Sequence, residues 1–417
     1  MDWILMALAA YNLSAIAMVL IPRTFHDPNN VATWLVFITT LLATELAWFW
    51  LPLQILLSFL FILGGALESR LGAFSMLVLA VSWLGLVWNV GLGLASGRMI
   101  ERGLVEELGN DYLQRIPPER RSRLRTEVGI SDWRRPFSMR RPGVEVIRDL
   151  AYAPGGIRTR LDVYRPENIP EDGCPVLLHI HGGAFMTGDK KRQALPLMYH
   201  LAERGWICVA ANYRLSPSVG FPVHLEDCKA ALCWIRREGM AYGMRTDFVA
   251  VTGGSAGGQL AALMGLTANR PEYQRGNEDI DTSVQACVPL YGAYDPLHRF
   301  GQHPNAEMVA KFLIDKVMHD TPENNPELWD QSSAIMQIHE QAPPFMVIHG
   351  THDSLCPVAD GRIFSEHLRA KSHNPVIWAE LEGAEHAFDV VHSPRTEHTV
   401  DGIHRFLEWA LTAHQDR

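Results

Sequence analysis

The sequence of 417 residues has no excess of positive charge and no grouping of metal-ligating side chains. Its formal net charge is −9 at pH 7, so it lacks the overall basic field of nucleic-acid-binding proteins and we expect no nucleic-acid partner. The six cysteines are scattered, without a C-x-x-C pair or a Cys/His cluster at ligand spacing, so we expect no metal. Most of them lie in or beside apolar runs, which is typical of small buried side chains and not of a disulfide framework.

Charge is also missing from long stretches near the N-terminus. No charged residue occurs at 3–21 or 71–97, and only Glu45 interrupts the apolar run at 30–66. Such runs are typical of transmembrane helices, because about 20 apolar residues cross a hydrocarbon core roughly 30 Å thick. The middle run is too long for one helix, so we interpret it as two spans that meet in a short hairpin near Glu45. This gives four spans, or three spans and a re-entrant segment.

Glu45 has two interpretations. A carboxylate at membrane depth is a candidate functional group. We favour a place at the tip of the predicted hairpin, in the headgroup region, because Trp48, Trp50 and Pro52 follow it closely.

The sequence changes abruptly after Gly97 and becomes rich in arginine up to Arg141. Positive residues next to a span mark its cytoplasmic side, so we expect the rest of the chain to face the cytoplasm. A solvated helix face is the alternative, because glutamates are interleaved with the arginines. The chain is thus divided into a transmembrane region at 1–96, an arginine-rich linker at 97–143 and a soluble domain at 144–417.

The soluble region alternates between strand-like and helix-like segments. Two alternating segments, at 143–152 and 157–166, predict antiparallel strands. Six continuous apolar runs follow, separated by helical stretches, at 175–180, 206–212, 248–253, 285–292, 344–350 and 375–381. This pattern predicts an α/β fold with a mostly parallel eight-stranded sheet covered by helices on both faces. The stretch from Asp295 to Pro343 has no clear strand and predicts a cap inserted at the carboxyl edge of the sheet.

One pentapeptide, Gly253-Gly254-Ser255-Ala256-Gly257, lies between a strand-like and a helix-like segment. The run FVAVT before it predicts a buried strand, and QLAALMGLTA after it has the apolar spacing of a helix. A serine on so sharp a turn exposes its hydroxyl at the carboxyl edge of the sheet, and the flanking glycines let the backbone form the turn. Ser255 is therefore the candidate nucleophile.

A serine nucleophile needs a base, an acid that orients the base, and backbone donors for the oxyanion. Asp353 and His386 each follow a strand-like run, and so does the glycine-containing loop at 181–185. N–H groups of this loop, together with the N–H of Ala256, could hold a developing negative oxygen. The order of oxyanion loop, serine, aspartate and histidine, each after its own strand, is that of the α/β-hydrolases.

Three neighbouring residues are competing candidates. Glu385 and Asp389 flank His386 and could be taken for the acid, but a residue beside the base on the same loop rarely reaches its Nδ1. His352 could be taken for the base, but the loop of the last strand would then have no role. We therefore favour His386 as base and Asp353 as acid.

These motifs resemble the hormone-sensitive-lipase-like branch of α/β-hydrolase esterases, also called bacterial family IV, over about residues 145–417. The matching segments are HGGAF at 181–185, NYRLSP at 212–217, FPVHLEDC at 221–228, GGSAGG at 253–258, HDSLCP at 352–357 and EHAF at 385–388. The resemblance implies an α/β-hydrolase fold that needs no metal or cofactor. It implies the following roles: nucleophile Ser255, acid Asp353, base His386, and oxyanion donors Gly182, Gly183 and Ala256.

The chain departs from the usual family motifs at two positions. Ala184 stands for the third glycine of H-G-G-G, and Gly254 stands for the aspartate before the serine in G-D-S-A-G-G. Helices between Glu101 and Arg141, with an insertion near 296–340, match the region that caps the pocket in this family. The N-terminal apolar runs are similar to those of membrane-tethered esterases, which include isoprenylcysteine methylesterases.

The sequence thus predicts a membrane-anchored serine carboxylesterase or lipase that hydrolyses hydrophobic carboxylic esters through an acyl-enzyme. Its expected partners are a small-molecule or lipid ester and the lipid bilayer. An amide hydrolase or acyltransferase with the same three residues is one alternative. A membrane scaffold with an inactive hydrolase domain is the other.

Overall fold

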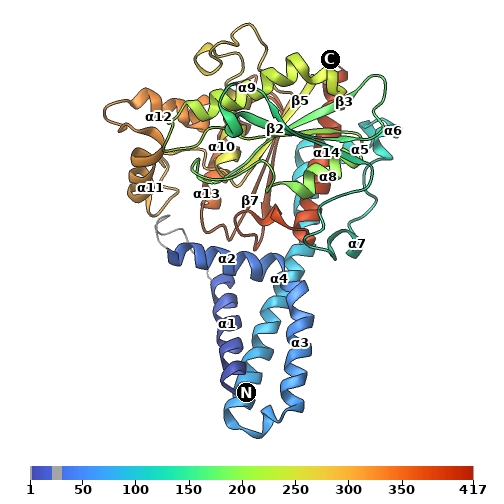
Figure 1. Ribbon diagram of the computed structural model, residues 1–417, viewed down its shortest axis with the longest axis vertical. Helices are drawn as coiled ribbons and strands as arrows, with labels where there is room; N and C mark the ends of the chain where they lie inside the picture. The colour runs from blue at the N-terminus through green and yellow to red at the C-terminus, as the bar shows by residue number, and fades with distance from the viewer. Residues whose placement is uncertain (1, 21–30, 417) are drawn as a thin grey trace.

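A twisted eight-stranded sheet lies at the centre of the larger part of the molecule (Figure 1). The computed structural model describes residues 2–20 and 31–416. The strands are β1 (Val144–Ala151), β2 (Arg160–Pro166), β3 (Cys174–Ile180), β4 (Ile207–Ala211), β5 (Met244–Gly254), β6 (Ala286–Leu290), β7 (Phe345–Gly350) and β8 (Val376–Leu381).

The strand order is β1-β2-β4-β3-β5-β6-β7-β8. Strand β2 pairs antiparallel with β1 and β4, and every other pair is parallel. The predicted α/β fold, with two antiparallel strands before six parallel ones, is confirmed. The carboxyl ends of the parallel strands meet at one edge, where open α/β sheets place their chemistry.

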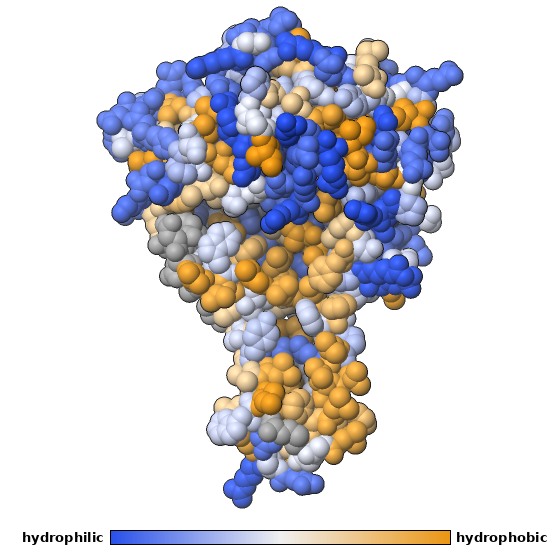
Figure 2. All heavy atoms as spheres, viewed as in Figure 1, coloured by the Kyte–Doolittle hydropathy of each residue, from blue (hydrophilic) through white to orange (hydrophobic). Residues whose placement is uncertain are grey.

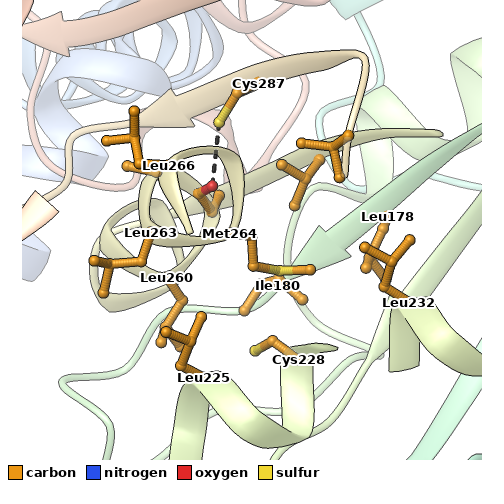
Figure 3. Packing of buried hydrophobic residues seen from close by; sticks show 14 of the residues in the cluster. Leu178, Ile180, Leu225, Cys228, Leu232, Leu260, Leu263, Met264, Leu266 and Cys287 are labelled. Atoms are coloured by element: carbon orange, nitrogen blue, oxygen red, sulfur yellow. Dashed lines mark hydrogen bonds between the residues drawn. The ribbon is translucent and has the colours of Figure 1, made fainter. Parts of the chain in front are cut away.

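Helices cover both faces of the sheet because its strands carry apolar side chains on both sides. On one face α9 (Val223–Glu238), α10 (Ala256–Leu266) and α13 (Val358–Lys371) pack against side chains such as Leu178 and Ile180 (Figure 3). On the other face α8 (Leu195–Glu203) and α14 (Pro394–Gln415) pack against Leu177 and its neighbours. Side chains of successive residues in β3 thus enter opposite halves of the core, as the alternation of a strand requires.

The cysteines belong to this core. All six are free thiols and five of them are buried. Cys287 donates a weak hydrogen bond from Sγ to the Ala261 carbonyl at 3.2 Å, and Cys228 lies among leucines on the same side of the sheet (Figure 3).

Among residues 2–20 and 31–108, four apolar helices precede the sheet: α1 (Asp2–Leu20), α2 (Val31–Glu45), α3 (Ala47–Leu63) and α4 (Arg70–Leu108). Helices α1, α3 and α4 lie side by side as a narrow bundle below the α/β domain, and α2 lies across the end of the bundle, under the domain (Figure 1). The bundle exposes a largely apolar surface (Figure 2).

The expectation of four spans has to be corrected. Among the described residues, two helices, α1 and α4, are long and apolar enough to cross a membrane by length and composition. Helices α2 and α3 are bent by 85° at the break between them, so they give a third span only if the pair counts as one. The predicted hairpin does not form, because α2 lies across the end of the bundle, under the α/β domain, instead of running beside α3.

The place expected for Glu45, at a hairpin tip among headgroups, is also wrong. Its side chain is 1% exposed and lies between the N-terminal helices and the domain. Its carboxylate accepts a hydrogen bond from Ser393 Oγ at 2.6 Å and forms an ion pair with Arg395, which is equally buried. The sequence around Glu45 does not predict the ion pair with Arg395, because the two residues are 350 positions apart in the chain.

The buried pair predicts a large effect on stability. Replacing Glu45 by alanine leaves the guanidinium of Arg395 buried without its counter-charge, which should lower the free energy of unfolding by about 3–5 kcal/mol. Chemical denaturation of the protein in detergent micelles measures this. The double variant Glu45→Leu/Arg395→Met should regain most of the loss, because no charge then remains unpaired. If the loss of unfolding free energy in the double variant equals the sum of the losses in the two single variants, the pair does not couple the N-terminal helices to the α/β domain.

The arginine-rich stretch at 97–143 runs along α14. Arg125 forms an ion pair with Glu397 at 2.6 Å, with both side chains buried, and Arg120 donates to Thr412 Oγ1 at 2.8 Å. Part of the arginine run therefore holds this stretch on the domain. The boundary expected at residue 96 falls inside α4, which is one helix of 39 residues.

Candidate active site

Ser255 lies on the turn between β5 and α10, with φ 59° and ψ −125°. An L residue rarely adopts this conformation, so the turn holds the serine in a strained backbone. A side chain on Gly257 would overlap the carbonyl oxygen of Ile180, so only glycine allows α10 to start this close to β3. The sharp strand-to-helix turn expected from the sequence is present.

Asp353 and His386 come from the loops after β7 and β8. His386 Nδ1 and Asp353 Oδ2 are 2.8 Å apart, and both side chains are nearly completely buried. Ser255 and His386 line one cavity. The structure thus brings the three residues singled out in the sequence to one edge of the sheet.

Asp353 has four polar contacts, three of them hydrogen bonds. Its Oδ1 accepts hydrogen bonds from the backbone N–H groups of Leu355 at 2.9 Å and Cys356 at 2.7 Å. Its Oδ2 faces His386 and also His349 Nε2, at 3.2 Å. Burial alone would raise the pKa of Asp353, but the two imidazoles outweigh it and hold this pKa well below its usual range. The carboxylate is therefore ionised and oriented toward His386.

The competing residues have other partners. Glu385 Oε1 accepts from the backbone N–H groups of Ser354 at 2.7 Å and His386 at 2.8 Å. Asp389 accepts a short hydrogen bond from the hydroxyl of Tyr291, and His352 Nδ1 contacts Thr351 Oγ1 at 2.9 Å. Within the described part of the chain, the carboxylate hydrogen-bonded to the imidazole of His386 is that of Asp353.

Glu385 makes a pH-dependent contribution to stability. Burial, and next the negative charge of Asp353, raise its pKa from 4.5 to about 7. The native state therefore binds more protons than the unfolded state between pH 4.5 and 7, and this stability is lost as the pH rises through 7. In Glu385→Gln the side chain stays neutral, so the variant's stability relative to wild type should increase by about 2 kcal/mol from pH 5 to pH 8.

Thermal and denaturant unfolding at the two pH values measure this difference. Glu366→Gln, which removes an exposed carboxylate on α13, is the matched control and should show no such change. A constant difference between Glu385→Gln and wild type would mean that Glu385 is already ionised at pH 5 in the folded protein.

The glycines expected to hold an oxyanion lie beside Ser255, but their N–H groups differ. Gly182 N–H donates to Gln193 Oε1 at 2.7 Å, so it is occupied in this structure. In the described part of the chain, the N–H groups of Gly183 and Ala256 have no protein acceptor. Of the three expected donors, the structure thus leaves two free to receive a substrate oxygen. Gln193 was missed in the sequence, because nothing in its spacing relates it to this loop.

Tyr291 explains why glycine precedes the serine. It directly follows β6, and its ring lies 4.7 Å from the imidazole of His386, centroid to centroid. A side chain at Gly254 would overlap the ring and hydroxyl of Tyr291. The tyrosine, hydrogen-bonded to Asp389, therefore fills the space next to Ser255. Burial raises the pKa of this tyrosine well above its ordinary value, so it is a neutral donor. The sequence had a signal for it, namely its position at a strand end.

The cavity at the serine has a volume of about 420 Å³ and is mostly apolar. One wall comes from α11 (Ala306–Leu313), in the stretch at 295–343, which forms α11, α12 (Pro326–Ser332) and no strand. Another wall comes from α2. No residue at 97–143 lines the cavity, so the helices expected there to cap it lie elsewhere, against α14. The apolar lining residues of the two walls are Trp34, Phe37, Leu41, Val309, Phe312 and Leu313.

A smaller polar area completes the lining. His298, His303 and Asp360 are buried, and burial raises the pKa of Asp360 to about 8. The described residues include no group of three or more His, Cys, Asp or Glu side chains arranged to hold a metal ion.

Known proteins resemble this chain in sequence and in fold. A family model described as BD-FAE matches residues 161–368. The probable carboxylic ester hydrolase LipM of Mycobacterium tuberculosis (strain ATCC 25618 / H37Rv) is 40% identical over 349 residues, which cover 79% of this chain and 78% of LipM. Esterase LipQ of the same organism is 42% identical over 260 residues, 62% of this chain and 61% of LipQ.

A solved structure of esterase B from Lactobacillus rhamnosis, inhibited by a tributyrin phosphonate, superposes with a TM-score of 0.56. The match covers 66% of this chain and 89% of that one, at 23% identity, and shows the likeness of fold. The similarity to LipM covers more of the chain than residues 144–417, which are 274 of the 417 residues, so it extends into the N-terminal part. The chain belongs to the α/β-hydrolase family of carboxylic ester hydrolases.

Proposed function

We propose that the protein is a membrane-anchored serine carboxylesterase in which Ser255, His386 and Asp353 act as a catalytic triad. The observation that carries this proposal is the buried hydrogen bond between His386 and Asp353 at the cavity that Ser255 also lines. A nucleophile on a strained turn, an oriented imidazole and an ionised carboxylate are the parts that serine acyl transfer requires.

The proposed reaction has two half-reactions. Ser255 Oγ attacks the ester carbonyl while His386 takes its proton, and the new oxyanion is held by the N–H groups of Gly183 and Ala256. The C–O bond to the alcohol then breaks, and the alcohol leaves with the proton from His386. Water, deprotonated by His386, attacks the acyl-enzyme in the same way and releases the acid and Ser255. Asp353 keeps the imidazole in one tautomer and stabilises the imidazolium.

A hydrophobic ester is the substrate class that the cavity favours. Its two helical walls are apolar, and burying apolar surface contributes about 25 cal/mol per Å². The polar area at His298, His303 and Asp360 is small by comparison and suits a single polar group of the ester.

Membrane anchoring is supported by α1 and α4 and by the apolar surface of the bundle (Figure 2). Side chains such as Leu77, Leu84 and Trp88 are more than 60% exposed there, which is unfavourable in water and favourable in lipid. Because Arg98 and Arg102 follow the apolar part of α4, we place the catalytic domain on the cytoplasmic side.

Activity-based labelling tests the proposal. The full chain in detergent micelles should hydrolyse p-nitrophenyl esters and should be labelled by a fluorophosphonate at one residue, which peptide mapping should identify as Ser255. Faster cleavage of matched anilides would indicate an amide hydrolase, and transfer of the acyl group to an added alcohol would indicate an acyltransferase. A folded protein that neither reacts with the probe nor hydrolyses esters would be a scaffold.

A further inference from the structure

Helix α2 belongs to the N-terminal region but forms part of the cavity at the serine. It lies across the top of the apolar bundle, directly under the carboxyl edge of the sheet (Figure 1). Trp34, Phe37 and Leu41 line the cavity. They are spaced i, i+3 and i+7, so they share one face of the helix. An element of the predicted membrane region thus closes one side of the pocket.

The contact reaches the proposed base itself. The ring of Phe37 meets the imidazole of His386 edge-on, with centroids 6.2 Å apart. An apolar chain that leaves Ser255 on this side would therefore run along α2.

A second face of α2, roughly a quarter of the way around the helix from the first, is apolar too and is exposed. Val31, Leu35 and Ile38 are 71%, 61% and 48% exposed. The apolar bundle of α1, α3 and α4 lies directly below this helix (Figure 1). Helix α2 therefore separates the cavity from the place where the bilayer surface would lie.

The position of α2 is fixed by the catalytic domain. At its last residue, Glu45 is paired with Arg395 and Ser393, at the start of α14 and just after the loop that carries His386. Two residues earlier, the Ala43 carbonyl accepts a hydrogen bond from Asn89 Nδ2 of α4 at 3.3 Å. These contacts hold the helix against both the bundle and the loop of the proposed base.

From these observations we infer that α2 is the specificity wall of the pocket, and that the substrate is a carboxylic ester with a long apolar chain taken up directly from the lipid phase. This inference rests on the proposed function and specifies its substrate class and entry side. The chain packs on Trp34, Phe37 and Leu41, while the ester carbonyl reaches Ser255.

Chain-length profiles of three variants test the wall. Phe37→Ala removes contacts from the chain, and Leu41→Trp fills the space that the chain occupies. In both, the ratio of kcat/KM for a decanoate ester to that for an acetate ester should fall about tenfold or more, because each buried methylene strengthens binding about fourfold. Ile38→Ala, on the same helix but facing outward, is the matched control and should keep the wild-type ratio.

The outcomes separate the two proposals. If wild type and Ser255→Ala hydrolyse both esters equally, the proposed function itself fails. If the variants are labelled by fluorophosphonate but keep the wild-type chain-length ratio, α2 is not the wall. An equal loss on acetate and decanoate in Phe37→Ala would mean that Phe37 acts only through His386, which also overturns the inference. Where Phe37→Ala does not fold, Leu41→Trp decides.

The source of the ester needs a second measurement. Protein reconstituted in phosphatidylcholine vesicles should hydrolyse a long-chain ester dissolved in its own bilayer at least tenfold faster than the same ester held in separate vesicles. Equal rates from the two sources would refute uptake from the adjoining bilayer.

Discussion

Replacing Ser255 by alanine should lower kcat on every ester by about 10⁶-fold, the size of loss seen when a serine protease loses its nucleophile. Alanine removes only Oγ, so the turn and the packing of α10 should stay intact. A residual rate above that of water is expected from binding and from the N–H groups of Gly183 and Ala256, since these do not depend on the hydroxyl.

Steady-state hydrolysis with both proteins in detergent measures this loss, and the melting temperature shows whether the fold is retained. Ser365→Ala is a matched control, because it removes a buried hydroxyl of α13 that does not line the cavity. Equal rates for Ser255→Ala and wild type would exclude Ser255 as the nucleophile.

Replacing Asp353 by asparagine should lower kcat by about 10⁴-fold. It should also lower the stability, because the buried charge that the two imidazoles stabilise is lost. The amide oxygen can keep the hydrogen bonds from the backbone of Leu355 and Cys356, so the loop is held. The amide NH₂ then faces His386 Nδ1, which can no longer donate, so the imidazole takes the wrong tautomer for accepting a proton from Ser255.

The comparison with Asp389→Asn makes this prediction specific. Asp389 is also buried close to His386, but it accepts from Tyr291 and not from the imidazole. Its asparagine variant should lose less than tenfold in kcat. A larger loss in Asp389→Asn than in Asp353→Asn would exchange the roles of the two carboxylates.

The order of elements and the turn at Ser255 could be predicted because their signals are local. Apolar runs of strand length, separated by helical spacing, specify the sheet whatever their partners are. The same holds for Asp353 and His386, whose position after a strand places them at one edge of a parallel sheet.

The environment of α2 could not be predicted in this way. An apolar run has the same composition whether it faces lipid or lines a protein cavity. The contact between Phe37 and His386 could therefore not be predicted from the sequence. Glu45 is the only charged residue in its apolar run, so the sequence indicates no partner for it. Arg395 is one of many arginines, eleven of which lie at 98–141, and nothing in the sequence distinguishes it from the others. The same reason applies to His349, which lies inside a strand and reaches Asp353 only through the geometry of the turn that follows.

Helix α4 has a mechanical consequence. It runs without a break for 39 residues, about 58 Å at 1.5 Å per residue, from the bundle to a firm contact of Ile100 and Leu104 with β8 and α14. A continuous helix cannot shorten, so under the proposed membrane anchoring its length would set the height of the α/β domain above the bilayer. A thinner or thicker bilayer must then tilt the helix or deform around it, and either response would change how closely α2 approaches the lipid.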